Sequence, residues 1–152
     1  MNFATRNYFA ALMVSGALAS GTAGAADPGL VTRASPWSVT DTVDRLEATA
    51  KARGLVVFAR IDHAKEAEKA GLAMKPTVLL LIGSPKAGTS VMQAAPSAAI
   101  DLPLKVLVAE APGGSTTVTI NDPAYLKTRH GLPDELVKNV SGLVPLLDAA
   151  LK

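Results

Sequence analysis

The chain of 152 residues contains no cysteine, so it can form no disulfide, no thiolate nucleophile and no thiolate metal site. Aromatic residues make up only 4% of it, and 15 Lys and Arg against 13 Asp and Glu leave a net charge of +2. Nucleic-acid binding depends on a basic surface and often on stacked aromatic side chains, so we expect no nucleic-acid partner. The length and the 49% hydrophobic content indicate one globular domain.

Long apolar runs are also lacking, except near the N-terminus. Residues 1–26 carry a single charge, Arg6, followed by an apolar stretch over 8–19 and by small residues that include Ala23 and Ala25. This pattern predicts a secretory signal peptide at 1–25, and therefore a periplasmic or secreted mature chain. The apolar stretch is shorter than the ~20 residues that cross a bilayer, so we expect no membrane span after processing.

The mature chain shows an ordered series of helix and strand signals. Residues 26–36 are expected to form a flexible lead-in or a first strand, and 37–152 a single domain. Expected strands are 55–62, 77–82, 104–110 and 115–121; expected helices are 39–53, 63–70, 122–129 and a last one from 134, interrupted before Pro145. In the strand at 55–62, strict alternation places Val57 and Ala59 on one face and Phe58 and Arg60 on the other. Strands clustered in mid-chain favour an antiparallel α+β fold.

A glycine-containing segment at 83–90 follows an aliphatic strand, which raises the question of a phosphate-binding loop. Such a loop needs Lys directly after its second glycine, and this chain has Thr89 there. We therefore reject a nucleotide-binding loop and expect an irregular segment over 83–99 with a turn of helix at 91–95. Two interpretations of this segment remain. Lys86, Thr89 and Ser90 hold a small anion, or the segment is a solvated turn without a ligand.

The mature chain has two histidines, and neither belongs to a known metal or hydrolase motif. If the fold brought His63 and His130 together beside a carboxylate, they could bind Zn²⁺ or Fe²⁺. Asp101 and Lys105 flank a proline-containing strand entry and could form a pocket-facing ion pair or a purely structural one. His63, Asp101, Lys105 and His130 are therefore the catalytic candidates, while the two histidines are the metal candidates.

Four phrases, in this order and spacing, resemble the domain-of-unknown-function family 302: residues 83–89 (GSPKAGT), 93–96 (QAAP), 99–105 (AIDLPLK) and 121–126 (NDPAYL). The resemblance covers residues 37–152 and implies a curved antiparallel sheet of about five strands backed by helices, similar to the TATA-binding-protein fold. It also implies bacterial or archaeal proteins that are often exported and have no established activity. It singles out His63, Pro85, Asp101, Lys105, Asp122 and His130 as shared-site candidates.

Three functions remain open at this stage. The favoured one is a periplasmic ligand-binding or accessory domain that holds a small anionic ligand through Lys86, Thr89, Ser90, Lys105 and Asp122. The second is a small hydrolase-type or metal-dependent enzyme that uses His63 or His130 with Asp101 and Lys105. The third is a protein-interaction domain without a small-molecule site, and a homodimer is compatible with each. The sequence assigns no cofactor.

Overall fold

The computed structural model describes residues 29–152, where five strands form one antiparallel sheet in the order β1-β5-β4-β3-β2. The strands are β1 (Leu30–Ser35), β2 (Val56–Asp62), β3 (Thr77–Gly83), β4 (Leu104–Glu110) and β5 (Thr116–Asn121). The helices are α1 (Val39–Ala52), α2 (His63–Lys69), α3 (Pro85–Ala94), α4 (Pro123–His130), α5 (Asp134–Val140), α6 (Leu143–Ala150) and a 3₁₀ helix, η1 (Pro96–Ile100). The expected α+β fold with a helix-backed antiparallel sheet is confirmed. The predicted signal peptide lies outside the described residues.

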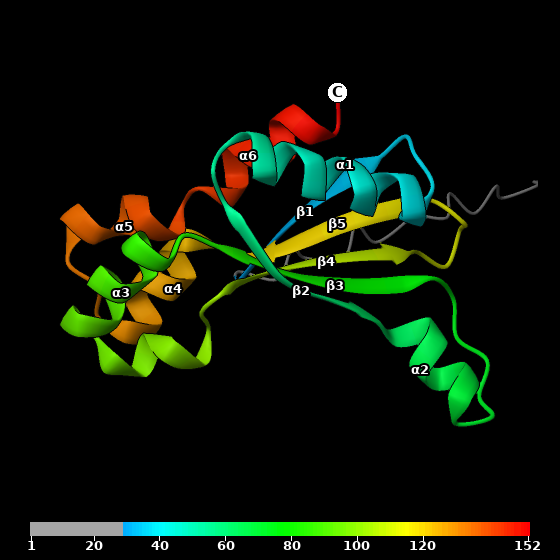
Figure 1. Ribbon diagram of the computed structural model, residues 1–152, viewed down its shortest axis with the longest axis horizontal. Helices are drawn as coiled ribbons and strands as arrows, with labels where there is room; N and C mark the ends of the chain where they lie inside the picture. Colours follow the sequence, from blue (N-terminus) through cyan, green and yellow to red (C-terminus); the bar gives the residue numbers. More distant parts are fainter. Residues whose placement is uncertain (1–28) are drawn as a thin grey trace, which may run out of the picture.

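Helices α1 and α6 pack together over one face of the sheet (Figure 1). Ser38 caps α1 by accepting a hydrogen bond from the Asp41 N–H at 3.1 Å, and the apolar stripe that follows faces the strands. The core beneath them consists of fully buried aliphatic side chains, among them Val43, Leu46, Leu80, Ile82, Val106, Val108, Val118, Leu146 and Leu147. Burial of this apolar surface is what holds the domain together in the absence of cross-links.

The remaining helices lie at the two ends of the sheet (Figure 1). Helices α3, α4 and α5 gather at one end, where α3 contacts α5 and η1, and α4 contacts α5. Helix α2 projects from the opposite end. In residues 29–152, no helix combines the length and apolar character needed to cross a membrane.

Strand β2 departs from strict alternation because its register against β3 shifts between Val57 and Ala59. Val57 lies opposite Ile82, and Arg60 lies opposite Leu80, so both share the helix-covered face with those buried residues. The prediction that Val57 and Arg60 point to opposite faces is therefore wrong. A β-bulge puts one extra residue in the strand, which periodicity alone cannot locate.

The segment predicted as irregular contains a ten-residue helix, α3, followed by η1. Ser84 is the N-cap and Pro85 occupies the first helical position, where its missing N–H costs nothing. Gly88 is a weak helix former, and the glycine, proline and serine content of residues 83–99 favoured a loop in the prediction. The apolar contact of Val91, which is fully buried, outweighs that weak propensity.

The C-terminal helix is divided as expected. Helix α5 ends at Val140, and α6 begins at Leu143, after Gly142. Pro145 then falls in the first turn of α6, where the backbone N–H has no intrahelical partner to lose. Leu143, Leu146, Leu147 and Ala150 can therefore form a continuous buried face against α1.

Candidate functional site

Three of the four catalytic candidates meet beside η1. The Nε2 atom of His130, the last residue of α4, lies 2.8 Å from Oδ2 of Asp101, the residue that follows η1. On the other side of the imidazole, Nδ1 lies 3.0 Å from Oγ of Ser97, within η1. The His130 side chain is only 3% exposed and that of Asp101 13%, whereas Ser97 is exposed. The result is a Ser–His–Asp hydrogen-bonded chain that runs from the surface inward.

Two cations contact the same carboxylate. Lys105 Nζ lies 3.8 Å from Oδ1 of Asp101 and also donates to the Ile100 carbonyl at 3.2 Å. Arg129 Nε lies 3.3 Å from Oδ2, and its Nη1 group donates a short hydrogen bond to the Tyr125 hydroxyl. The bond to Tyr125, followed by the charge of Asp101, raises the pKa of the Arg129 guanidinium. We call Ser97, Asp101, Lys105, Arg129 and His130 the Asp101 cluster.

His63 is not part of this cluster. It begins α2, at the end of the sheet opposite α4 (Figure 1). Among residues 29–152, no group of three or more His, Asp or Glu side chains is arranged to hold a metal ion. The described structure therefore does not bring the two histidines together, and the joint metal site that the sequence left open has no geometry to support it.

An apolar cavity of about 280 Å³ lies on the other side of the segment that follows Asp101. Its walls come from β2, the end of β3, α3, residues 102–104 and α5. The lining residues are Phe58, Gly83, Ser84, Pro85, Gly88, Thr89, Met92, Leu102, Pro103, Leu104 and Asn139. None of these described residues is charged, and Ser84, Thr89 and Asn139 supply the polar side chains. Such a cavity suits a small neutral molecule with an apolar body and one or two polar groups.

The predicted ligand-binding residues do not share one pocket. Thr89 lines the cavity, while Lys86 and Ser90 lie around a neighbouring hollow with Ser84 and Asn139. Lys105 belongs to the Asp101 cluster. Asp122 caps α4, accepting a hydrogen bond from the Ala124 N–H at 2.7 Å. A single anion cradle formed by all five predicted residues is therefore not present in the described part of the chain.

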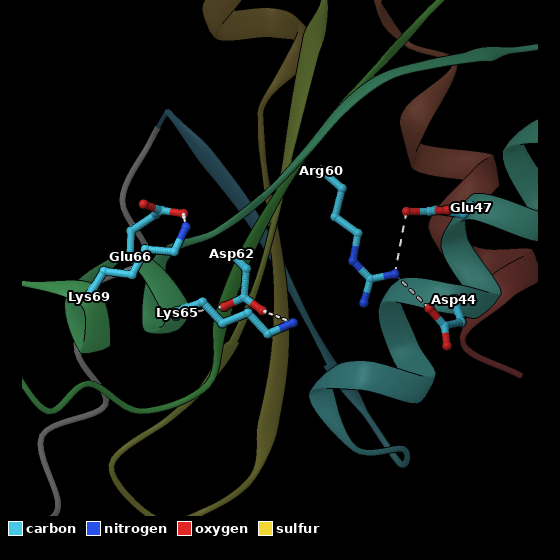
Figure 2. Close-up of polar contacts among 7 residues, drawn as sticks. All are labelled: Asp44, Glu47, Arg60, Asp62, Lys65, Glu66 and Lys69. Atoms are coloured by element: carbon cyan, nitrogen blue, oxygen red, sulfur yellow. Dashed lines mark hydrogen bonds and ion pairs between the residues drawn. The ribbon is translucent and has the colours of Figure 1, made fainter.

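Ion pairs of a different kind surround β2 and α2 (Figure 2). Arg60 Nη1 lies 2.8 Å from Asp44 and 3.6 Å from Glu47, both on α1, and we call these three residues the Arg60 cluster. On α2, Asp62 pairs with Lys65 at 3.3 Å, and the hydrogen bond that its carboxylate accepts from the Lys65 N–H lowers the pKa of Asp62. A wide hollow of about 730 Å³ opens between these residues and the exposed side chains of Leu72 and Met74.

Ser97 and Arg129 are the members of the Asp101 cluster that the sequence did not single out as site residues. Ser97 is 33 residues from His130, and no local spacing links an exposed serine to a distant imidazole. Arg129 directly precedes His130 in the sequence, and its position in the last turn of α4 brings it to Asp101 as well. That adjacency is the signal that could have included it.

The fold and the two sites define a class: a small α+β domain with one helix-covered face of an antiparallel sheet, an uncharged cavity and a buried polar cluster. The chain matches the family described as "Domain of unknown function DUF302" over residues 31–150, and it belongs to that family. A crystal structure of an uncharacterized conserved DUF302 protein from Bacillus stearothermophilus matches with a TM-score of 0.69 and 22% identity, covering 82% of this chain and 97% of that one. This similarity shows the fold alone.

Curated relatives come from Brucella. The chain is 44% identical over 106 residues to proteins named fluoride-specific ion channel FluC 1 from Brucella suis and Brucella abortus. The match covers 70% of this chain but only 42% and 39% of those proteins. The chain thus spans about two-fifths of the length of these curated relatives.

Proposed function

We propose that this chain is an exported accessory domain that binds a small neutral ligand in the cavity beside α3. The observation that carries the proposal is the cavity itself, with apolar walls and three polar side chains. Its volume of about 280 Å³ lies at the lower end of the ~300–1,000 Å³ typical of small-molecule sites. The ligand is therefore smaller than a typical drug molecule.

Two features of the lining support binding. Phe58 is 49% exposed at the cavity, and a large apolar side chain that borders a hollow gains burial when a ligand covers it. Gly83 and Gly88 contribute no side chains, and a Cβ at Gly88 would approach Leu102 Cδ1 to 3.9 Å. A Cβ at either wall position would make only ordinary van der Waals contacts, so a longer side chain is needed to fill the cavity from there.

Indole is a suitable first probe, because it has an apolar body and a single N–H donor. In a protein-observed NMR titration, we expect saturable shift changes at the amides of Gly83, Gly88 and Thr89. Gly88→Leu places an isobutyl group at the cavity wall and should abolish these changes. The matched control is Gly142→Leu, at a glycine with ordinary helical φ and open space around it. Absence of saturation, or equal shifts in both variants, would refute ligand binding at this cavity.

Export is part of the proposal and rests on the pattern of residues 1–25. Expression of the full chain in a Gram-negative host should yield a periplasmic product whose N-terminal residue is Ala26. Recovery of the unprocessed chain in the cytosol would contradict this part of the proposal and leave the cavity proposal standing.

The Brucella relatives favour a second candidate function, as a partner of an ion channel. A domain that forms two-fifths of proteins named as fluoride channels can act on the channel part of the same chain. The test uses the Brucella suis protein without its matching segment, reconstituted in liposomes. Fluoride efflux should change when this chain is added to the side on which the segment was removed, and an unchanged efflux would reject the partnership.

A further inference from the structure

Ser97, His130 and Asp101 form a continuous hydrogen-bonded chain that the proposed ligand cavity does not use. The two heavy-atom distances, 3.0 Å from Ser97 Oγ to Nδ1 and 2.8 Å from Nε2 to Asp101 Oδ2, both lie in hydrogen-bond range. A nucleophile in contact with a base that a third group orients is the arrangement that activates a hydroxyl group. Ser97 and Asp101 come from η1 and its C-terminal end, and His130 comes from α4, so the fold brings the histidine to the other two.

The carboxylate determines which nitrogen of His130 carries the proton. Asp101 Oδ2 can only accept, so Nε2 must carry hydrogen to donate to it. In the neutral imidazole, Nδ1 then has a free lone pair, and it accepts the Ser97 O–H. Burial of the ring, which is 3% exposed, holds this orientation. Ser97 is therefore polarised by a correctly oriented base.

The three residues of this hydrogen-bonded chain differ in their exposure to solvent. The base and the carboxylate are buried, but Ser97 is exposed and can meet a molecule from solution. The side chains of Lys105 and Arg129 are also 37% and 46% exposed, and Arg129 Nε contacts Asp101 Oδ2 at 3.3 Å. Its charge, with that of Lys105, more than offsets the carboxylate. Both cations contact the carboxylate end of the hydrogen-bonded chain, so they help to hold Asp101 in place while Ser97 faces solvent on the other side of the imidazole.

We propose that Ser97 is an activated nucleophile that accepts acyl groups from activated carboxylic esters. Ser97 Oγ forms a bond to the ester carbonyl carbon, while its proton passes to Nδ1 of His130. The bond to the leaving alkoxide breaks, and the alkoxide takes that proton. Water then attacks the acyl-serine and gives its proton to Nδ1, which returns it to Ser97 Oγ as the carboxylic acid leaves. His130 is the general base, and Asp101 is a positioning residue.

The direct test is covalent labelling of the purified protein with a fluorophosphonate, followed by peptide mass spectrometry. We expect an adduct on Ser97 that forms at least tenfold faster than on any other serine. Ser97→Ala should remove it, and it should also reduce p-nitrophenyl acetate hydrolysis at least tenfold. Ser115→Ala is the matched control, because Ser115 is exposed in the β4–β5 turn and belongs to no such chain. That variant should behave as the unaltered protein.

A second pair of variants separates activation from a purely structural contact. His130→Gly should lose labelling and regain it when free imidazole is added, because the small molecule can occupy the vacated space. Asp101→Asn should slow labelling at least tenfold while circular dichroism stays unchanged. Labelling of Ser97 at the rate of Ser115, hydrolysis that persists in Ser97→Ala, or labelling of His130→Gly that imidazole does not restore would each overturn the proposal.

Discussion

The Arg60 cluster and the Asp101 cluster contain the same kinds of charged group in very different surroundings. Arg60 and Asp44 have side chains that are 38% and 60% exposed, whereas Asp101 and His130 are 13% and 3% exposed. Water can replace each partner in the first cluster, so its ion pairs contribute little to stability. In the second, three side chains, those of His130, Arg129 and Lys105, converge on one carboxylate, and a lost partner leaves buried polar atoms unpaired. The Arg60 and Asp101 clusters therefore differ in burial and in how many groups contact one carboxylate, more than in the charges that they contain.

The largest expected effect is therefore at Asp101. Asp101→Ala leaves the buried Nε2 of His130 without an acceptor and should lower the free energy of unfolding by about 2 kcal/mol. Urea denaturation at neutral pH measures this. Asp44→Ala is the matched carboxylate from the Arg60 cluster and should cost less than about 1 kcal/mol. Equal losses in both variants would remove the contrast between the clusters.

A smaller effect is expected at Arg60. Arg60→Met keeps much of the side-chain length and removes the charge, so it should cost about 0.5 kcal/mol. The loss should shrink in 1 M NaCl, where the Debye length falls to about 3 Å. Urea denaturation in low and high salt measures both values. A loss that is independent of salt would mean that packing, and not the ion pairs with Asp44 and Glu47, is what Arg60 contributes.

The smallest expected effect is the loss of the stability contribution of Asp62 at low pH. The pKa of Asp62 is lowered by the backbone hydrogen bond from Lys65, so the folded state binds its proton less readily than the unfolded state does. Its contribution to stability is thus present above the ordinary value of 3.8 and is lost as the pH falls through the folded-state pKa. NMR titration of the Asp62 carboxyl should give a midpoint below 3.8. A midpoint at or above 3.8 would show that the exposed cap has no effect.

Much of the fold follows from local signals. The helix signal at 39–53 predicted α1, the strand signals at 104–110 and 115–121 predicted β4 and β5, and Pro145 predicted the division of the last helix. The helix at Pro85–Ala94 was missed because tertiary burial of Val91 outweighs the weak helix propensity of its neighbours. A helix or strand can be predicted from the local sequence where its capping residue and its apolar face both indicate it. The prediction fails where only tertiary packing stabilises the element.

The candidate sites are less predictable for a different reason. The sequence offered Asp101, Lys105 and His130 as candidates for one site, and the fold does place them together, but nothing within the sequence requires α4 to end against η1. The cavity could not be foreseen at all, since its walls come from residues 58 to 139 and include a helix that the sequence did not predict. Contacts between distant segments are decided by tertiary packing, and tertiary packing does not follow from the local patterns of a single sequence.

The irregularity in β2 has a consequence for how the cavity can vary. Val57 pairs with Ile82 and Ala59 with Leu81, neighbours on β3, so Phe58 occupies no rung of its own. Removing Phe58 would leave both flanking stretches aligned as they are, with every side chain on its present side. The strand thus carries an aromatic ring that its backbone ladder does not require. An insertion or deletion of one residue at this position of β2 can add or remove this wall of the cavity without changing which face of the sheet the other side chains occupy.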